Sequence, residues 1–257
     1  MEMNNDQYNE FNEKLGRIKN ELIPIFQNYI VPIFILPSQS SCGLIDVITN
    51  GTGFLLNLHG KYLLVTCSHV WEEFIHLNSP NATIGAAMGN NKLFNLSKQL
   101  PIANSKERDI AIFDVSHHVV NEKFGNKSFY VPQTWPPRRP KENDLVLVLG
   151  YPGMFRQPTQ GNINIVFILD FIRNISDNTI TLRDENNERK MICYNDLLPD
   201  LNDFGGFSGA PAFAQYDEDK WTFIGIMYEG AYQIYDSPVG IISITHADFI
   251  ISASEIR

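Results

Sequence analysis

The sequence predicts an all-β protein in two halves of about equal length, with one helix added at each end. Short apolar runs rich in β-branched residues recur along the chain, and turn residues separate them at close spacing, as in antiparallel barrels and sandwiches. A proline-rich stretch near the middle divides these runs into two sets. The chain has 257 residues, of which 44% are hydrophobic and 12% aromatic, so it can bury a large core.

Residues 1–28 are predicted to form an N-terminal unit, with an amphipathic helix over residues 5 to 23. Apolar residues recur there at alternating steps of three and four, which places them on one face: Tyr8, Phe11, Leu15, Ile18 and Leu22. Pro24 follows this stripe and is expected to end the helix. The stripe either packs on the body of the protein or serves as a docking surface for a partner.

Residues 29–130 are expected to form the first set of strands. The predicted strands are Ile33–Leu36, Gly43–Ile48, Gly53–Leu58, Lys61–Thr66, Ala82–Ala87, Lys92–Leu96 and Asp109–Val115. Asn50-Gly51 and His59-Gly60 are typical of tight hairpin turns, because Asn and Gly adopt positive φ at little cost.

A connector is predicted over residues 131–143, and the second set of strands follows over residues 144–257. The connector contains four prolines, which favour an extended chain: Pro132, Pro136, Pro137 and Pro140. The strands predicted after it are Leu145–Leu149, Ile163–Phe171, Thr179–Leu182, Met191–Cys193, Ala212–Gln215, Trp221–Tyr228 and Gly240–Ile244. Asp217 to Lys220 form a charged hairpin tip. Thr245 and Asp248 have the spacing of a helix-capping pair, so a short helix is expected at the C-terminal end.

Composition and charge exclude several classes of function. A net charge of −9 argues against nucleic-acid binding, because neutralising phosphates requires clustered Lys and Arg. The polar N-terminus lacks the features of a secretory signal, and no apolar run reaches the about 20 residues that a membrane helix needs. Cys42, Cys67 and Cys193 are scattered without metal-ligand spacing. We expect a cytoplasmic protein with reduced thiols and with neither a metal nor a cofactor.

The stretch Asp203-Phe204-Gly205-Gly206-Phe207-Ser208-Gly209-Ala210-Pro211 places a serine among glycines in a turn. Glycines allow such a turn to direct consecutive N–H groups at one point. A hydroxyl beside those groups is a nucleophile next to an anion-stabilising hole, which acyl transfer requires. Glycine-rich turns with a serine also occur without any catalytic role. The function therefore depends on whether the chain also supplies a base and an orienting carboxylate.

His69 is the best candidate for the base among six histidines. It lies where a predicted buried strand turns into a helix, a position that can hold a side chain rigidly against a cleft. Asp109 precedes another buried strand, and a carboxylate there is costly unless it is hydrogen-bonded. It either caps the strand end or fixes the tautomer of an imidazole. Asp114 lies on the opposite face of that strand and is the weaker candidate.

Four motifs in this order resemble the trypsin/chymotrypsin-like serine peptidases: Gly51-Thr52-Gly53-Phe54, Val65-Thr66-Cys67-Ser68-His69-Val70, Asp109-Ile110-Ala111 and Gly206-Phe207-Ser208-Gly209-Ala210-Pro211. The order histidine, aspartate, serine is that of the family, and the separations of 40 and 99 residues also agree with it. The resemblance covers about residues 30 to 250 and implies two antiparallel six-stranded β-barrels. Val70 stands where secreted members carry a cysteine, so the chain is more similar to intracellular bacterial or HtrA-type members.

The resemblance implies a role for each matched residue. Ser208 is the nucleophile, His69 the general base and then acid, and Asp109 the partner of the imidazole, as in the family archetype. The backbone N–H groups of Gly206 and Ser208 form the oxyanion hole. The implied activity is that of a serine endopeptidase that cleaves a protein substrate through an acyl-enzyme, in limited and regulated proteolysis.

The resemblance also implies where a substrate binds. An extended peptide is expected to add to the strand that contains Tyr228, Glu229 and Gly230. The pocket for the side chain before the cut is expected beside Gly240, with its floor near Asn202 or Asp203. An inward Asp203 favours a basic side chain there, whereas an inward Asn202 favours a polar or small one.

Two other functions compete with proteolysis. A catalytically silent scaffold of the same fold would bind a protein partner through its cleft and N-terminal helix, and a regulatory protein could use the same helix on an active enzyme. An esterase is the other option. It is disfavoured because Gly206-Phe207-Ser208-Gly209-Ala210 lacks the final glycine of the α/β-hydrolase nucleophile motif.

Overall fold

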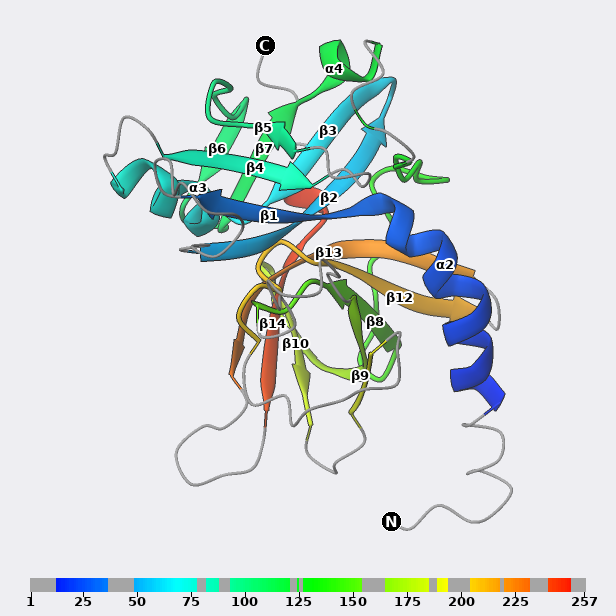
Figure 1. Cartoon of the computed structure of the whole chain (residues 1–257). Helices are drawn as coiled ribbons and strands as arrows, with labels where there is room; N and C mark the ends of the chain where they lie inside the picture. Colours follow the sequence, from blue (N-terminus) through cyan, green and yellow to red (C-terminus); the bar gives the residue numbers. More distant parts are fainter. Residues whose placement is uncertain are drawn as a thin grey trace.

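The computed structural model of the chain describes residues 13–36, 49–77, 82–87, 93–120, 124, 127–153, 165–184, 189–193, 204–217, 220–231 and 240–250. Within these residues the chain forms two antiparallel sheets (Figure 1), and the N-terminal helix runs along the side of the second one. The prediction of an all-β protein in two halves is confirmed.

The N-terminal helix continues through Pro24, so the prediction that this proline ends it is wrong. Its described segments are helical residues 13–17, then η1 (Ile18–Leu22), α2 (Ile23–Phe26) and η2 (Gln27–Tyr29). The segment η1 is a π-helix, in which the N–H of Ile23 bonds to the carbonyl of Ile18. Pro24 is the second residue of α2, which directly follows the π-helical turn, so the helix takes up the proline where its hydrogen-bonding pattern changes.

The inner face of this helix packs on the body of the protein. The side chains buried or half-buried there are Leu15, Ile18, Leu22, Ile23 and Phe26. Phe26 stacks on Phe213 of the second sheet, with ring centroids 4.3 Å apart and ring planes 5° apart. Tyr8 and Phe11 lie outside the described residues. The described part of the predicted stripe therefore packs internally.

The first sheet has seven strands in the order β5-β4-β1-β2-β3-β7-β6. Their bounds are β1 Ile30–Leu36, β2 Thr49–Leu58, β3 Lys61–Thr66, β4 Thr83–Ala87, β5 Leu93–Asn95, β6 Ala103–Ser105 and β7 Ile110–Asp114. Helices α3 (Ser68–His76) and α4 (Ser116–Val120) follow β3 and β7. Among the described residues no pairing joins β5 to β6, so this sheet forms a half-barrel, which is consistent with the expected double-barrel fold.

Two turn predictions in this sheet have different outcomes. Asn50-Gly51 is not a turn, because both residues lie in β2 and pair with Phe34 and Ile33 of β1. The local turn preference is overridden by sheet pairing. His59-Gly60 does form the β2–β3 turn, with φ values of 51° and 83°. The predicted strand at 43–48 lies outside the described residues, and the short polar strand β6 was not predicted.

The second sheet closes into a barrel. Its order is β10-β14-β13-β12-β8-β9-β11, and β10 also pairs with β9. The bounds are β8 Leu145–Gly150, β9 Val166–Ile175, β10 Thr179–Arg183, β11 Lys190–Cys193, β12 Pro211–Asp217, β13 Lys220–Ala231 and β14 Ile241–His246. All of these strands were predicted. Asp217 pairs with Lys220 at the expected hairpin tip.

The C-terminal end forms its helical turn later than the capping pair suggested. Residues 248–250 are helical, whereas Thr245 lies in β14. The Thr245 hydroxyl donates to the carbonyl of Arg108 at 2.8 Å and so links β14 to the segment before β7. Its predicted capping role is wrong because Thr245 lies inside β14, three residues before the helical turn begins.

One hydrophobic core includes side chains from both sheets. Phe54 of β2 packs against Phe223 of β13 and Phe213 of β12, with centroids 4.5 and 6.0 Å apart. A second core fills the closed barrel. The chain segments that follow β3, precede β7 and precede β12 carry the predicted catalytic residues. The division at 131–143 stays a prediction.

Candidate active site

Asp109 lies at the end of β7 that faces the start of α3. The register of β3 and β7 pairs Thr66 with Ala111, which brings the residues just after β3 beside those just before β7. Asp109 has a φ of 49°, a left-handed conformation that Asp tolerates better than most residues. This conformation turns the chain into β7 at the point where the carboxylate is needed.

Asp109 binds His69 at two points. Its Oδ2 lies 2.6 Å from His69 Nδ1, and its Oδ1 accepts a hydrogen bond from the His69 backbone N–H at 2.9 Å. Both proposed roles of this carboxylate, backbone cap and imidazole partner, are thus present together. With Nδ1 donating to Asp109, the neutral imidazole has its lone pair on Nε2, which can then accept a proton.

The environment of His69 makes it a stronger base. Burial opposes protonation of the imidazole, but the hydrogen bond and the negative charge of Asp109, with a contribution from Glu73, outweigh it and raise the pKa of His69 above its ordinary value. The side chain is 43% exposed, against 19% for Asp109. A partly exposed, correctly oriented imidazole can exchange protons with a bound molecule.

Ser208 lies in two successive tight turns held by buried aromatic side chains. The N–H of Phe207 donates to Phe204 O at 3.0 Å, and that of Ala210 donates to Phe207 O at 2.7 Å. Phe204 and Phe207 are buried, whereas Ser208 is half-buried. Gly206 and Gly209 have φ values of 94° and 90°, which glycine adopts at least cost.

Two N–H groups of this turn have no acceptor among the described residues, those of Gly206 and Ser208. The carbonyl of Gly205 accepts from Gly153 N at 2.8 Å, and that of Phe207 accepts from Ala210 N. In a trans peptide group the N–H points opposite to the C=O, so the N–H groups of Gly206 and Ser208 point away from these partners. An anion-binding hole requires such unpaired donors.

The buried thiol of Cys67 touches both parts of the site. It donates to the carbonyl of Met227 at 3.3 Å, and the same carbonyl accepts from Gly209 N at 2.8 Å. The thiol also lies within 4.8 Å of the ligand atoms of His69 and Asp109. The structure therefore joins His69 to Asp109 by a hydrogen bond and sets the turn of Ser208 against the same thiol.

Cys67, His69 and Asp109 are the group of described residues whose ligand atoms lie close enough to share a metal ion. Two of those atoms, His69 Nδ1 and Asp109 Oδ2, are already hydrogen-bonded to each other. Burial first, and then the charge of Asp109, raise the pKa of the Cys67 thiol well above its ordinary value. The thiol therefore stays protonated near neutral pH, whereas metal binding requires thiolate.

The predicted substrate strand is part of β13. Tyr228 and Gly230 are half-buried and Glu229 is exposed, and the pairing with β14 shifts register between Met227 and Glu229. A Cβ on Gly230 would come within 2.8 Å of the Phe204 ring, so this edge of β13 packs closely on the segment that leads to Ser208. Asn202 and Asp203 lie outside the described residues.

A buried ion pair beside Gly240 was not predicted. Arg189 Nε and Nη2 both lie 2.7 Å from Asp170 Oδ2, and Nη2 also donates to Gly240 O at 3.0 Å. Burial raises the pKa of Asp170 against the opposing charge of Arg189. The one sequence feature that could have indicated this ion pair is Asp170 itself, an acid inside the apolar run of β9, because a buried carboxylate requires a partner.

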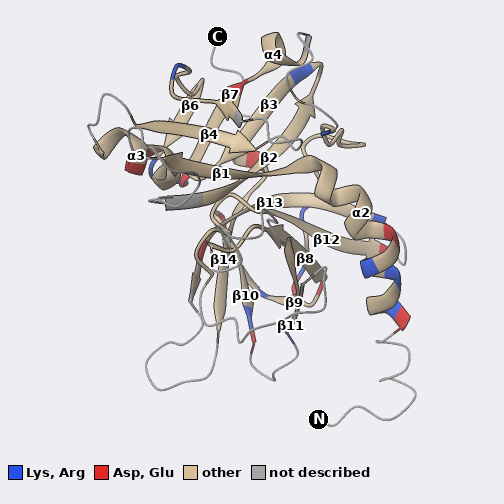
Figure 2. Cartoon of the chain, viewed as in Figure 1, with Lys and Arg blue, Asp and Glu red and all other residues tan. Residues whose placement is uncertain are grey.

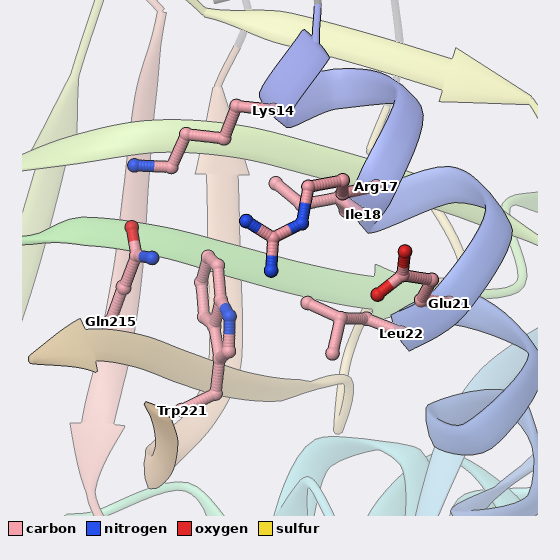
Figure 3. A pocket seen from close by; sticks show the side chains of 7 residues that line it. All are labelled: Lys14, Arg17, Ile18, Glu21, Leu22, Gln215 and Trp221. Atoms are coloured by element: carbon pink, nitrogen blue, oxygen red, sulfur yellow. The ribbon is translucent and has the colours of Figure 1, made fainter. Parts of the chain in front are cut away.

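A separate cavity lies between the N-terminal helix and the β12–β13 hairpin (Figure 3). Its volume is about 290 Å³, and it is lined by Lys14, Arg17, Ile18, Glu21, Leu22, Gln215 and Trp221. None of the predicted catalytic residues lines it. No helix in the described part of the chain is long and apolar enough to span a bilayer.

Comparison with known proteins agrees with this fold. A family model described as a trypsin-like peptidase domain matches residues 51–226. Among solved structures, the crystal structure of Deg5 is similar with a TM-score of 0.53 and 11% sequence identity, over 98% of this chain and 95% of Deg5. At that identity the likeness concerns the fold, and it confirms the double-barrel architecture of the chymotrypsin type. No curated protein matches the chain.

Proposed function

Because this chain belongs to the trypsin-like peptidase domain family, we propose that it is a serine endopeptidase acting through His69, Asp109 and Ser208. The observation that carries the proposal is the bond of 2.6 Å between His69 Nδ1 and Asp109 Oδ2, made beside the turn of Ser208. The fold of a serine protease is present in any case. The proposal concerns the residues that perform the reaction.

The proposed reaction has two halves. The Oγ of Ser208 attacks the peptide carbonyl while His69 Nε2 takes its proton, and the charge on the carbonyl oxygen is stabilised by the N–H groups of Gly206 and Ser208. The C–N bond breaks as His69 returns the proton to the leaving amine. Water then attacks the acyl-enzyme with His69 again as base, and Ser208 regains its proton. Asp109 stabilises the imidazolium in both halves.

The proposed substrate is an extended segment of a protein. It would pair with β13 at Tyr228, Glu229 and Gly230, where backbone hydrogen bonds give affinity and side-chain pockets give selectivity. The side chain before the cut would enter a pocket beside Gly240. If Asp203 points into this pocket, we propose a basic residue before the cut. If Asn202 points into it, we propose a polar or small residue.

We further propose limited, regulated proteolysis in the cytoplasm. The buried, unbridged thiol of Cys67 supports a reducing compartment. A regulatory protein would contact the outer face of the N-terminal helix, since the inner face packs on the barrel. The described part of that helix carries charges of both signs (Figure 2), and its Glu13 and Glu21 are exposed.

A fluorophosphonate probe tests the proposal directly, because it phosphonylates only an activated serine. We expect the folded protein to be labelled and Ser208→Ala to be unlabelled with an unchanged melting temperature. Ser128→Ala, at an exposed serine away from the turn, is the matched control and should label as the unmodified chain does. Absence of labelling in correctly folded protein would favour the silent scaffold.

A further inference from the structure

One side chain of the first sheet is anchored in the turn that carries Ser208. Thr52 of β2 is fully buried, and its hydroxyl donates to the carbonyl of Gly206 at 2.8 Å, 154 residues away in the sequence. The same hydroxyl accepts from the N–H of Tyr151 at 3.1 Å. The backbone N–H of Thr52 donates to the carbonyl of Ser208 at 2.8 Å. Thr52 therefore holds the turn on both sides of Phe207.

The turn packs closely against the backbone of β2 around Thr52. A Cβ on Gly209 would lie 2.1 Å from the carbonyl oxygen of Thr52, so the turn touches the β2 backbone directly. That carbonyl is itself fixed by the Thr66 hydroxyl at 2.9 Å. Gly51 also approaches closely, since a Cβ there would lie 3.2 Å from Ser208 O.

Rotation of a peptide group in this turn would change its electrostatics. Glycine has little steric preference between the two orientations of its neighbouring peptide groups, so Gly205 and Gly206 do not fix them. A carbonyl turned toward the reacting oxygen would repel the charge that an N–H stabilises. The peptide group of the Gly206 N–H is held through the Gly205 carbonyl by Gly153 N, and that of the Ser208 N–H through the Phe207 carbonyl by Ala210 N. Thr52 holds the carbonyls of Gly206 and Ser208, which belong to the next peptide group in each case and so fix the backbone on the other side of both residues.

We infer that Thr52 is a positioning residue that keeps the N–H groups of Gly206 and Ser208 directed at the oxyanion, an inference that rests on the proposed peptidase function. It acts through the turn and does not touch the substrate. The hydroxyl is the essential group, because it donates to Gly206 while accepting from Tyr151 at the end of β8. A methyl group in its place would leave both of these buried groups without their partner.

The kinetic test compares Thr52→Val, which has the same shape without the hydroxyl, with Thr52→Ser, which retains it. For Thr52→Val we expect kcat on a peptide substrate and the rate of fluorophosphonate labelling to fall by about tenfold or more, with KM changed by less than about threefold. Thr52→Ser should recover most of the rate. Thr66→Val removes another fully buried hydroxyl from the same region. Its loss of kcat and of labelling rate should be severalfold smaller than that of Thr52→Val.

Hydrogen exchange of residues 204–210 provides a readout independent of activity. Thr52→Val should speed exchange in this segment by about tenfold relative to the unmodified chain and Thr52→Ser. Thr52→Ala replaces Thr52→Val if the latter does not fold. Unchanged exchange in the folded variant would overturn the inference even if the unmodified chain proved inactive. Failure of the unmodified chain to label would instead overturn the proposed function.

Discussion

Asp109 shows how one residue can serve the local backbone and the proposed chemistry together. One carboxylate oxygen receives the backbone N–H of His69, and the other binds its ring. The ring therefore cannot rotate without breaking the second bond, and the first bond holds the start of α3 in place. Because the negative charge favours the imidazolium, the pKa of His69 is raised.

The raised pKa of His69 predicts the pH dependence of the reaction. A protonated imidazole cannot accept the serine proton, so kcat/KM should fall as the pH drops through a pKa above the ordinary value of about 6.5. The linked contribution to stability has the opposite sign, because it is fully present below about pH 6.5 and is lost as the pH rises through the folded pKa. Both effects are checked by measuring kcat/KM and urea unfolding between about pH 5 and about pH 9, a range that includes the ordinary pKa of histidine and the raised pKa of His69.

Asp109→Asn separates these effects. We expect kcat to fall by about 10⁴, because an amide that donates to Nδ1 favours the wrong tautomer. The fall of the residual kcat/KM on the acid side of the pH profile (the acid limb) should move to lower pH, since the negative charge that raises the His69 pKa is gone. Asp114→Asn is the control, because Asp114 is exposed and caps Ser116 N at 2.9 Å. An unchanged acid limb in Asp109→Asn would show that another group sets it.

Among the elements, the N-terminal helix differs most from its local prediction. Its π-helical turn changes the phase between residues 13–17 and α2, so that Ile23 and Phe26, on either side of Pro24, both reach the core. Phe26 lies against Phe213 of β12, which also packs on Phe54 of the first sheet. The helix is thus part of the contact between the two sheets.

Phe26→Ala tests the contribution of this helix. We expect the free energy of unfolding to fall by about 3–5 kcal/mol, because the substitution removes a buried stacked ring and leaves a cavity. Ile25→Ala changes the neighbouring residue, which is 50% exposed, and should cost less than about 0.5 kcal/mol. Chemical denaturation measures both. Similar losses in the two variants would mean that the helix does not depend on its inner face.

At the scale of the whole molecule, the two sheets depend on one shared core. Phe223 is fully buried and packs on Phe54 across the contact. Trp135 of the connecting segment stacks on the ring of Phe223, with ring centroids 6.4 Å apart. The candidate site lies at the same contact, since His69 and Asp109 flank strands of the first sheet and Ser208 lies in the turn before β12 of the second. Separation of the sheets would therefore remove the site as well.

This shared core predicts a single cooperative unfolding transition. Variants that retain only Trp71 or only Trp221 report on the first and second sheets separately, and their urea midpoints should coincide. Phe223→Ala should lower both midpoints together, at a cost of about 3–5 kcal/mol. If the Trp221 midpoint moved while the Trp71 midpoint stayed, the two sheets would be independent units.

Sequence patterns alone were sufficient for the alternation of strands, the all-β class and the three candidate residues. Those properties depend on side-chain periodicity and on short motifs around His69, Asp109 and Ser208, which are local. The bond between His69 and Asp109 was expected from the motifs and is present. The assignments of Ser208, Gly206 and the substrate residues stay predictions.

Other features required the folded chain. Asn50-Gly51 and Thr245 have clear local preferences, and each is overridden by pairing with strands that are distant in the sequence. The anchoring of the turn by Thr52 and the pairing of Arg189 with Asp170 leave almost no local signal. The physical reason is that burial makes each polar group depend on whichever partner the packing brings within hydrogen-bonding distance, and only the three-dimensional arrangement of strands selects that partner.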